Sequence, residues 1–327
     1  MRVVRTGRRR GGAVISVSDF QEALSRFARE CGDATVARAV RAVAAGTAAP
    51  LRVAVDGRVG VGRATLARAL SAAEWRIVED GADPDAAVVV VAEAVKPEDA
   101  ATLTRWREAG VPVLLVRNKA DLAGAVPVDA LPVVALLADV RLDDASVDAL
   151  RVLTEQPADL RSVDAFVDGP HPLPRAVRQH LLRTLDRRGV AHTVRALRDG
   201  AEPADLLARL RALSNIDGLL AELAALTAPV RYRRIRSALA DLQALAAGSE
   251  AVADFLTADE TVLAVMAAAV DVVRAAGLTV DPADHPAAHL HRAVRWRAYS
   301  RGPVGPLHRA CGADISRGSL RLFARRR

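Results

Sequence analysis

The sequence predicts an α/β protein, with a doubly wound, mostly parallel sheet between an N-terminal helical segment and a C-terminal all-α domain. Short apolar runs alternate with helical patterns over residues 49–157, which is typical of parallel strands with helices on both faces. Residues 14–48 have helical spacing without such strands. Beyond residue 175 almost every run is again helical.

The N-terminal helical segment has two runs, and the second ends near Gly46, a residue that favours helix termination. Five strands are then expected at 51–57, 74–80, 86–94, 111–117 and 131–140. The helices between and after them are expected at 63–70, 97–110 and 144–156. Residues 86–94 are apolar on both faces, as a central parallel strand should be.

Residues 158–174 are predicted to be a linker because prolines crowd its end. Residues 175–327 are predicted to form the C-terminal helical domain. Within it, the basic stretch 231–236 contains Tyr232 but no series of aromatic side chains, so a solvated face is favoured over nucleic-acid binding. For residues 313–327, a packed last helix is favoured over a helix lying on a membrane surface.

The composition is that of a globular protein in a reducing compartment. With 327 residues, of which 51% are hydrophobic, the chain can bury a core in more than one domain. Cys31 and Cys311 lack the spacing of a disulfide framework or a zinc site, so we expect a cytoplasmic protein. The most apolar late stretch, 261–277, contains charged residues and is too short for a transmembrane segment.

The net charge of +7 is concentrated near the chain ends and indicates solubilising tails rather than a specific partner. Residues 1–13 are predicted to be a disordered basic tail, and Val14 is a candidate for the native first residue. Among the histidines, His285, His289 and His291 are close enough in sequence for a metal site with a nearby aspartate. Solvated loop histidines are the favoured interpretation.

The segment GRVGVGRAT (57–65) follows the first expected strand and opens a helix. It contains three glycines that would let successive backbone N–H groups approach a phosphate: Gly57, Gly60 and Gly62. The phosphate-binding pattern G-x-x-x-x-G-K-[ST] requires lysine and a hydroxyl next, and Arg63 and Ala64 occupy those places. Thr65 comes one residue too late.

These replacements have predictable effects. Arg63 keeps the positive charge, but its longer, planar head is not equivalent to a lysine ammonium. Ala64 lacks the hydroxyl that holds Mg²⁺ against the phosphates. We therefore expect nucleotide binding with poor Mg²⁺ coordination. Taken alone, the segment also resembles the start of a small-molecule kinase such as a uridine-kinase-like enzyme.

The tetrapeptide NKAD (118–121) decides between these interpretations, because it directly follows a strand. With the glycine segment, it makes residues 51–155 resemble the P-loop GTPase superfamily, in its Era-like or translation-factor-like branch. The resemblance implies that Asp121 binds the guanine edge, that the Lys119 stem lies along the base and that Asn118 ties this loop to the phosphate loop. It also implies that Ala138 is one of the nucleotide-binding residues. Ala138 matches the alanine of the family's Ser-Ala pair, and Leu137 stands at the serine position.

Other parts of the family pattern are altered. The best match to D-x-x-G is residues 80–83, which end in an aspartate that would repel a γ-phosphate. Only the tripeptide SAA lies between Leu70 and Glu74, so the metal-sensing loop and its strand are expected to be deleted. The resemblance thus implies that guanine recognition is retained while hydrolysis is weak or lost, and no catalytic residue or metal ligand is assigned.

Three functions remain open. The first is a degenerate GTPase-like protein that binds GTP or GDP weakly and acts through its helices on a protein partner, for example a complete GTPase. The second is an active GTPase that uses Arg63. The third is a nucleotide-free scaffold that keeps only the sheet.

Overall fold

The computed structural model describes residues 17–73, 75–78, 82–121 and 130–325. The chain divides into two compact units. One consists of residues 50–226, and the other combines residues 1–49 with residues 227–327.

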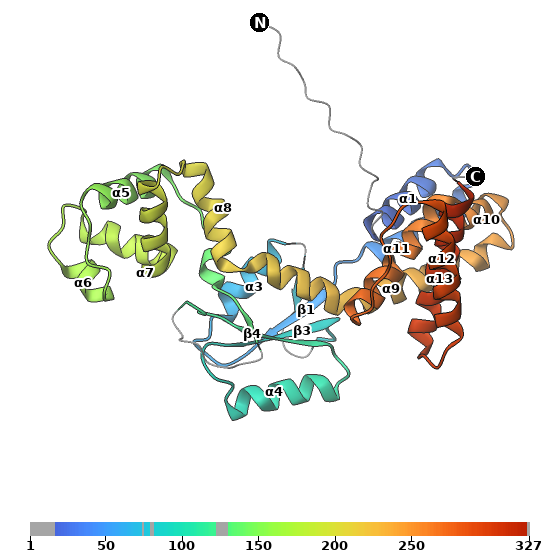
Figure 1. Ribbon diagram of the computed structural model, residues 1–327, viewed down its shortest axis with the longest axis horizontal. Helices are drawn as coiled ribbons and strands as arrows, with labels where there is room; N and C mark the ends of the chain where they lie inside the picture. Colours follow the sequence, from blue (N-terminus) through green and yellow to red (C-terminus); the bar gives the residue numbers. More distant parts are fainter. Residues whose placement is uncertain (1–16, 74, 79–81, 122–129, 326–327) are drawn as a thin grey trace, which may run out of the picture. The chain divides into compact units, whose positions relative to one another are not determined.

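The first unit contains a five-stranded, all-parallel sheet in the order β2-β1-β3-β4-β5 (Figure 1). Its strands are β1 (Arg52–Asp56), β2 (Arg76–Val78), β3 (Ala86–Val91), β4 (Val113–Arg117) and β5 (Leu131–Pro132). The predicted parallel α/β class is therefore confirmed. The strand order reverses between β1 and β3, which is where ligands bind in open parallel sheets, beyond the carboxyl ends of the strands.

Helices cover both faces of the sheet (Figure 1). On one face, Val53, Val88 and Val90 pack against α3 (Arg63–Ser71) and the first part of α9 (Ile216–Ala246). On the other face, the alternate side chains of β1 and β3 pack against α4 (Pro97–Glu108). All six residues of β3 are buried, which explains its uninterrupted apolar sequence.

The predicted strand at 131–140 is wrong in its length. β5 has only two residues, and a 3₁₀ turn, η1 (Ala135–Leu137), follows it closely. The Val133 N–H still bonds to Arg117 O at 2.8 Å, but the next N–H, of Val134, bonds to Ser214 O at 3.0 Å. The chain leaves the sheet here because Leu137 belongs to a different hydrophobic cluster.

That cluster is formed with four helices: α5 (Asp144–Glu155), α6 (Val163–Asp168), α7 (Arg175–Arg198) and α8 (Pro203–Ser214). Phe166, Leu181 and Leu185 are fully buried in it. We call α5–α8 the helical lobe. It belongs to the same unit as the sheet, so the predicted boundary near residue 175 does not coincide with the division between the units, which falls within α9 after residue 226.

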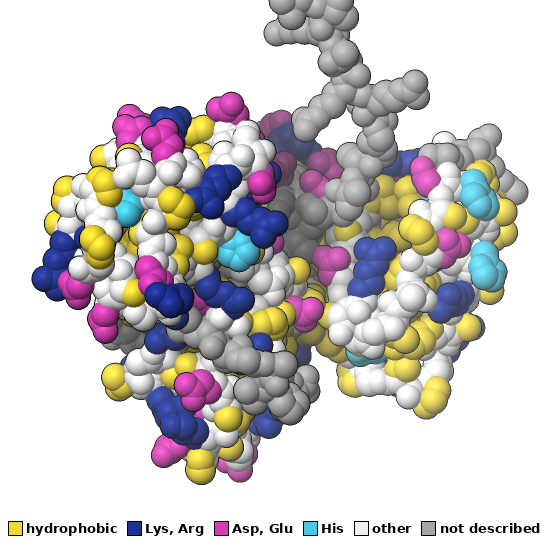
Figure 2. All heavy atoms as spheres, turned by 60° about the vertical axis from the view of Figure 1, so that its left-hand side comes forward, with side chains coloured by type: hydrophobic (Ala, Val, Ile, Leu, Met, Phe, Trp, Pro, Cys, Tyr) yellow, Lys and Arg dark blue, Asp and Glu magenta, His cyan; other side chains and the backbone are white. Residues whose placement is uncertain are grey.

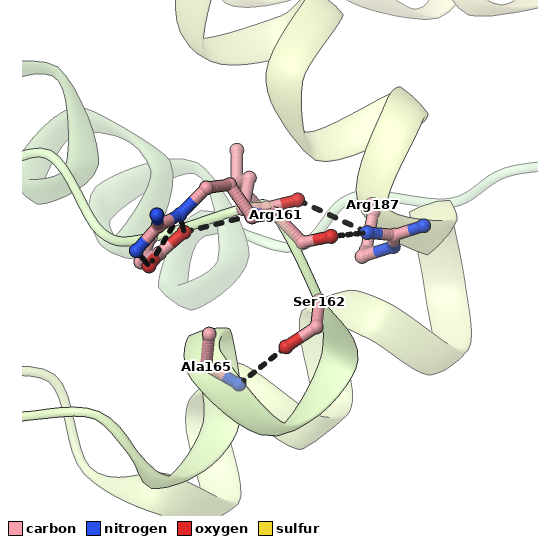
Figure 3. Close-up of polar contacts among 6 residues, drawn as sticks. Arg161, Ser162, Ala165 and Arg187 are labelled. Carbon is pink, nitrogen blue, oxygen red and sulfur yellow. Dashed lines mark hydrogen bonds and ion pairs between the residues drawn. The ribbon is translucent and has the colours of Figure 1, made fainter.

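The predicted linker at 158–174 is instead an ordered part of this lobe, as Figure 3 shows. Ser162 caps α6 by accepting a hydrogen bond from the Ala165 N–H at 3.0 Å. The Arg187 guanidinium donates to the carbonyl oxygens of Leu160, at 3.2 Å, and Arg161. The prolines interrupt the helices, but arginine donors from α7 satisfy the carbonyl groups of the connecting segment.

The second unit is all helical: α1 (Val17–Glu30), α2 (Ala34–Ala48), the last part of α9, α10 (Glu250–Thr257), α11 (Asp259–Ala275), α12 (Pro286–Arg301) and α13 (Pro306–Ala324). Phe20 and Leu24 of α1 are fully buried in one core with residues of α9, α11 and α13. The N-terminal helical segment is therefore part of this unit, because its apolar stripe packs in one core with residues of these later helices. No helix in the described ranges combines the length and apolarity needed to cross a membrane.

Stretch 231–236 has an exposed basic side, which includes Arg233 and Arg236, and a buried side. Tyr232 is fully buried, and its hydroxyl donates to Asp314 Oδ2 at 2.6 Å. Burial, together with the nearby Asp314 carboxylate, raises the pKa of Tyr232. Arg236 lies 3.4 Å from the same carboxylate oxygen.

On the face drawn in Figure 2, Lys and Arg side chains are interspersed with Asp and Glu rather than gathered in one patch.

Replacing Tyr232 by phenylalanine tests this buried contact. Because Tyr232→Phe leaves the buried Asp314 carboxylate with Arg236 alone, we expect the unfolding free energy to fall by about 1.5–3 kcal/mol in urea denaturation. The control is Tyr299→Phe, which removes a hydroxyl 2.8 Å from His308 Nδ1 in a partly buried place. The control should cost less than about 1 kcal/mol, and equal losses in the two variants would contradict this account.

Candidate functional site

The glycine segment connects β1 to α3 at the carboxyl edge of the sheet. All three glycines have left-handed backbone angles, with φ of 140° at Gly57, 87° at Gly60 and 94° at Gly62. A Cβ on Gly57 would lie 2.4 Å from Val90 O, and one on Gly62 would lie 2.2 Å from Asn118 Nδ2. Glycine is therefore required at both ends of the loop, where the backbone passes close to neighbouring segments.

The start of α3 leaves donors available. Gly62 is the N-cap and offers no side-chain capping bond. The backbone N–H groups of Arg63, Ala64 and Thr65 have no acceptor among the described residues. The Arg63 side chain likewise has no hydrogen bond or ion pair within that part of the chain. Free N–H groups at the positive end of a helix dipole can bind an anion.

Two ion pairs hold the glycine segment against α4. Asp56 accepts a hydrogen bond from the Gly57 N–H at 2.7 Å through Oδ1, and its Oδ2 pairs with Arg105. Arg58 Nε lies 3.0 and 3.1 Å from the two oxygens of Asp99, whose carboxylate is fully buried. Sequence reasoning missed Arg58, Asp99 and Arg105 as partners, because salt-bridge pairing across more than 40 positions has no local signal.

The NKAD segment contacts the glycine segment directly. Asn118 is buried, and its Nδ2 donates to Val61 O at 2.8 Å while its Oδ1 accepts from the Ala135 N–H at 2.9 Å. Lys119 has a left-handed φ of 55°, and its Nζ donates to Gly60 O at 2.9 Å. One amide side chain therefore joins the loops that follow β1, β4 and β5.

Asp121 lies at the edge of a cavity of about 440 Å³ between this loop and the helical lobe. The apolar part of its wall includes Val133, Val134 and Leu137. Arg188 and His192 of α7 add polar groups, and Arg188 Nη1 donates to the backbone carbonyl of Asp121. No sequence signal pointed to Arg188 or His192, which the lobe brings to the cavity from 67 and 71 positions away.

The remaining predicted residues that the structure describes do not line the cavity. Ala138 follows η1 outside the cavity lining, and Leu137 lines the cavity instead. Of the predicted D-x-x-G match, Asp80 and Gly81 lie outside the described residues. Asp83 is 92% exposed and 3.3 Å from Arg52. Because only four residues separate the end of α3 from the start of β2, and β2 pairs directly with β1, this short connection leaves no room for another strand.

The histidine cluster has structural roles. His285 caps α12, since its Nδ1 accepts from the Ala288 N–H at 3.2 Å. His289 is buried, with Nδ1 2.7 Å from Arg292 Nη2 and Nε2 3.1 Å from Asp284 Oδ1. Over the described ranges, no three His, Cys, Asp or Glu side chains gather in a way that could hold a metal ion.

Comparison with known proteins adds no further constraint: no family model, curated protein or solved structure matches the chain. A functional assignment therefore depends on the contacts between the glycine segment, the NKAD segment and the lobe.

Alanine substitutions at two glycines test the contact between the loops. Gly62→Ala combines an unfavourable φ with a clash against Asn118, and we expect it to lower the unfolding free energy by about 2–4 kcal/mol. Gly60→Ala is the control, because its φ is also left-handed but nothing lies within 4 Å of its Cβ. The control should cost only about 1–2 kcal/mol in the same urea titration. A larger loss in Gly60→Ala than in Gly62→Ala would be inconsistent with the packing described here.

Proposed function

We propose that the chain is a degenerate GTPase-like protein of the P-loop class, which binds GDP or GTP weakly and hydrolyses little or none of it. The observation that carries this proposal is a pair of hydrogen bonds between the loops, one from Asn118 Nδ2 to Val61 O and one from Lys119 Nζ to Gly60 O. These bonds hold a phosphate-type loop and a base-type loop side by side at one edge of a parallel sheet. Such an edge is where nucleotides bind.

The phosphate end of the proposed site lacks the lysine and the hydroxyl of the usual pattern, but it has other groups that can bind an anion. The N–H groups at the start of α3, which have no acceptor among the described residues, can donate to phosphate oxygens. Arg63, which has no partner in the same part of the chain, adds a positive charge at the first residue of the helix. Lys119 is already directed at the glycine loop, so both cations and backbone donors favour an anion there.

The residues do not fit a Mg²⁺ site. Ala64, which is exposed, has no side-chain oxygen to offer the metal. The carboxylate of Asp56 is engaged by the Gly57 N–H and by Arg105. Since phosphoryl transfer to water depends on a metal that neutralises the developing charge, these residues favour nucleotide binding without turnover.

A protein partner remains part of the proposal. On α12, Leu290 and Val294 are one helical turn apart, and they are 43% and 62% exposed. Exposed apolar pairs of this kind are common at protein contacts, although single ones are ordinary surface features. The helical unit is therefore the part of the chain that we assign to partner binding, and a complete GTPase is one candidate partner.

Calorimetric titration of the full chain with GDP, GTP and ATP, each with and without Mg²⁺, tests nucleotide binding. We expect micromolar or weaker affinity for guanine nucleotides, little effect of Mg²⁺ and weaker binding of ATP. Asp121→Asn should reduce the preference for guanine about 10-fold, because it removes a charged acceptor. The exposed Asp139→Asn is the matched control and should behave as wild type. Equal binding of ATP and GTP would favour a kinase-like site, and no binding would favour a scaffold.

Hydrolysis is tested separately by phosphate release from GTP over many turnovers. Because no residue at the loop fits a metal ligand, we expect a rate close to that of buffer, and the same rate for Arg63→Ala. Multiple-turnover hydrolysis that disappears in Arg63→Ala would overturn this part of the proposal and identify an active GTPase.

A further inference from the structure

We propose that Arg188, in the helical lobe, recognises the guanine base by hydrogen bonding together with Asp121. Specificity for the base would then depend on residues of both the NKAD segment and α7. This inference rests on the proposed function and deepens it. The Asp121 carboxylate would accept hydrogen bonds from N1–H and N2–H of guanine. The Arg188 guanidinium would donate to the adjacent acceptors, O6 and N7, a pairing that fits the planar fork of arginine.

The placement of Arg188 supports this role. Its Nη1 donates to the backbone carbonyl of Asp121, so the guanidinium lies beside the residue that would hold the neighbouring edge of the base. Arg188 has no carboxylate partner among the described residues, which leaves its other N–H donors for a ligand. An arginine guanidinium has five N–H donors, of which this contact uses one.

The cavity suits a purine. Its volume of about 440 Å³ lies in the range of small-molecule sites. Val133, Val134 and Leu137 form an apolar wall that can pack against a ring, while Asp121 and Arg188 supply an acceptor and a donor. Lys119 lies between the proposed phosphate site and the proposed base site. Its Nζ contacts the glycine segment, and the next two residues line the cavity.

Backbone strain is concentrated around the same cavity. In the described ranges, three residues other than glycine have positive φ: Lys119 at 55°, Asp186 at 58° and Asn215 at 54°. Lys119 adjoins the cavity lining, Asn215 is part of it, and Asp186 interrupts α7 two residues before Arg188. Such conformations cost energy and tend to persist where a site requires them. The interruption at Asp186 sets the direction of the helical segment that carries Arg188 and His192.

The donor and acceptor pattern selects guanine over adenine. Adenine has an amino group at position 6, where guanine has O6, and that group would face the Arg188 donors. In the same orientation, adenine presents Asp121 with the N1 lone pair and C2–H instead of two adjacent N–H groups. Arg188 therefore acts as a specificity-determining residue, and its effect should depend on the acceptors O6 and N7.

A comparison of GDP with 7-deaza-GDP, which lacks the N7 acceptor, tests the inference by calorimetry on the full chain. Wild type should bind GDP about 10-fold more tightly than 7-deaza-GDP, the equivalent of one charged hydrogen bond. In Arg188→Met the two affinities should become equal, and in Arg188→Lys the difference should become smaller, because an ammonium can still donate to N7 but lacks the planar fork. The lysine variant separates bidentate recognition from simple attraction of the phosphates, because it keeps the positive charge.

Arg183→Met is the matched control, because Arg183 is an exposed residue of α7 outside the cavity lining. It should keep the wild-type ratio of affinities. An unchanged ratio in both Arg188 variants would overturn the role of Arg188 while leaving the proposed function intact. A wild-type chain that binds neither nucleotide would overturn the proposed function and this inference together.

Discussion

The buried amide of Asn118 is the interaction on which the candidate site depends. It bonds to Val61 O on one side and to the Ala135 N–H on the other, so it joins loops that follow three different strands. A buried amide without these partners would cost roughly 1–3 kcal/mol per unsatisfied group. The close approach also explains why position 62 is glycine, since any Cβ there would collide with the amide nitrogen.

The helical lobe adds side chains to the carboxyl edge of the sheet. In the strand order of this protein, the loops after β1 and β4 already lie at the ligand-binding edge. The lobe then adds a wall with Arg188 and His192 to an open cavity beside Asp121. The helix that covers the sheet next to α3 is the first part of α9, from Ile216 onward. Residues 144–214 are thus inserted between the last strand and a helix of the sheet layer.

Charge pairing differs between the two ends of the glycine segment. Arg63 and the N–H groups at the start of α3 remain unpaired within the described ranges, whereas Asp56 and Arg58 are bound to Arg105 and Asp99 of α4. A carboxylate that is already neutralised by arginine has little tendency to coordinate a cation as well. The same segment can therefore attract an anionic ligand while lacking the groups that promote its hydrolysis.

The sequence by itself determined the parallel sheet, the glycine-rich turn and the NKAD segment, because strand periodicity, left-handed glycines and a strand-terminal motif are local properties. It did not determine where residues 158–226 belong, nor that α1 and α2 pack with the last helices. Those outcomes depend on which apolar faces cover one another, and Phe20 and Phe166 look alike in sequence although they lie in different cores. Only the tertiary structure decided that Arg188 lies beside Asp121, because a contact across 67 residues is set by packing of the lobe and not by any local pattern.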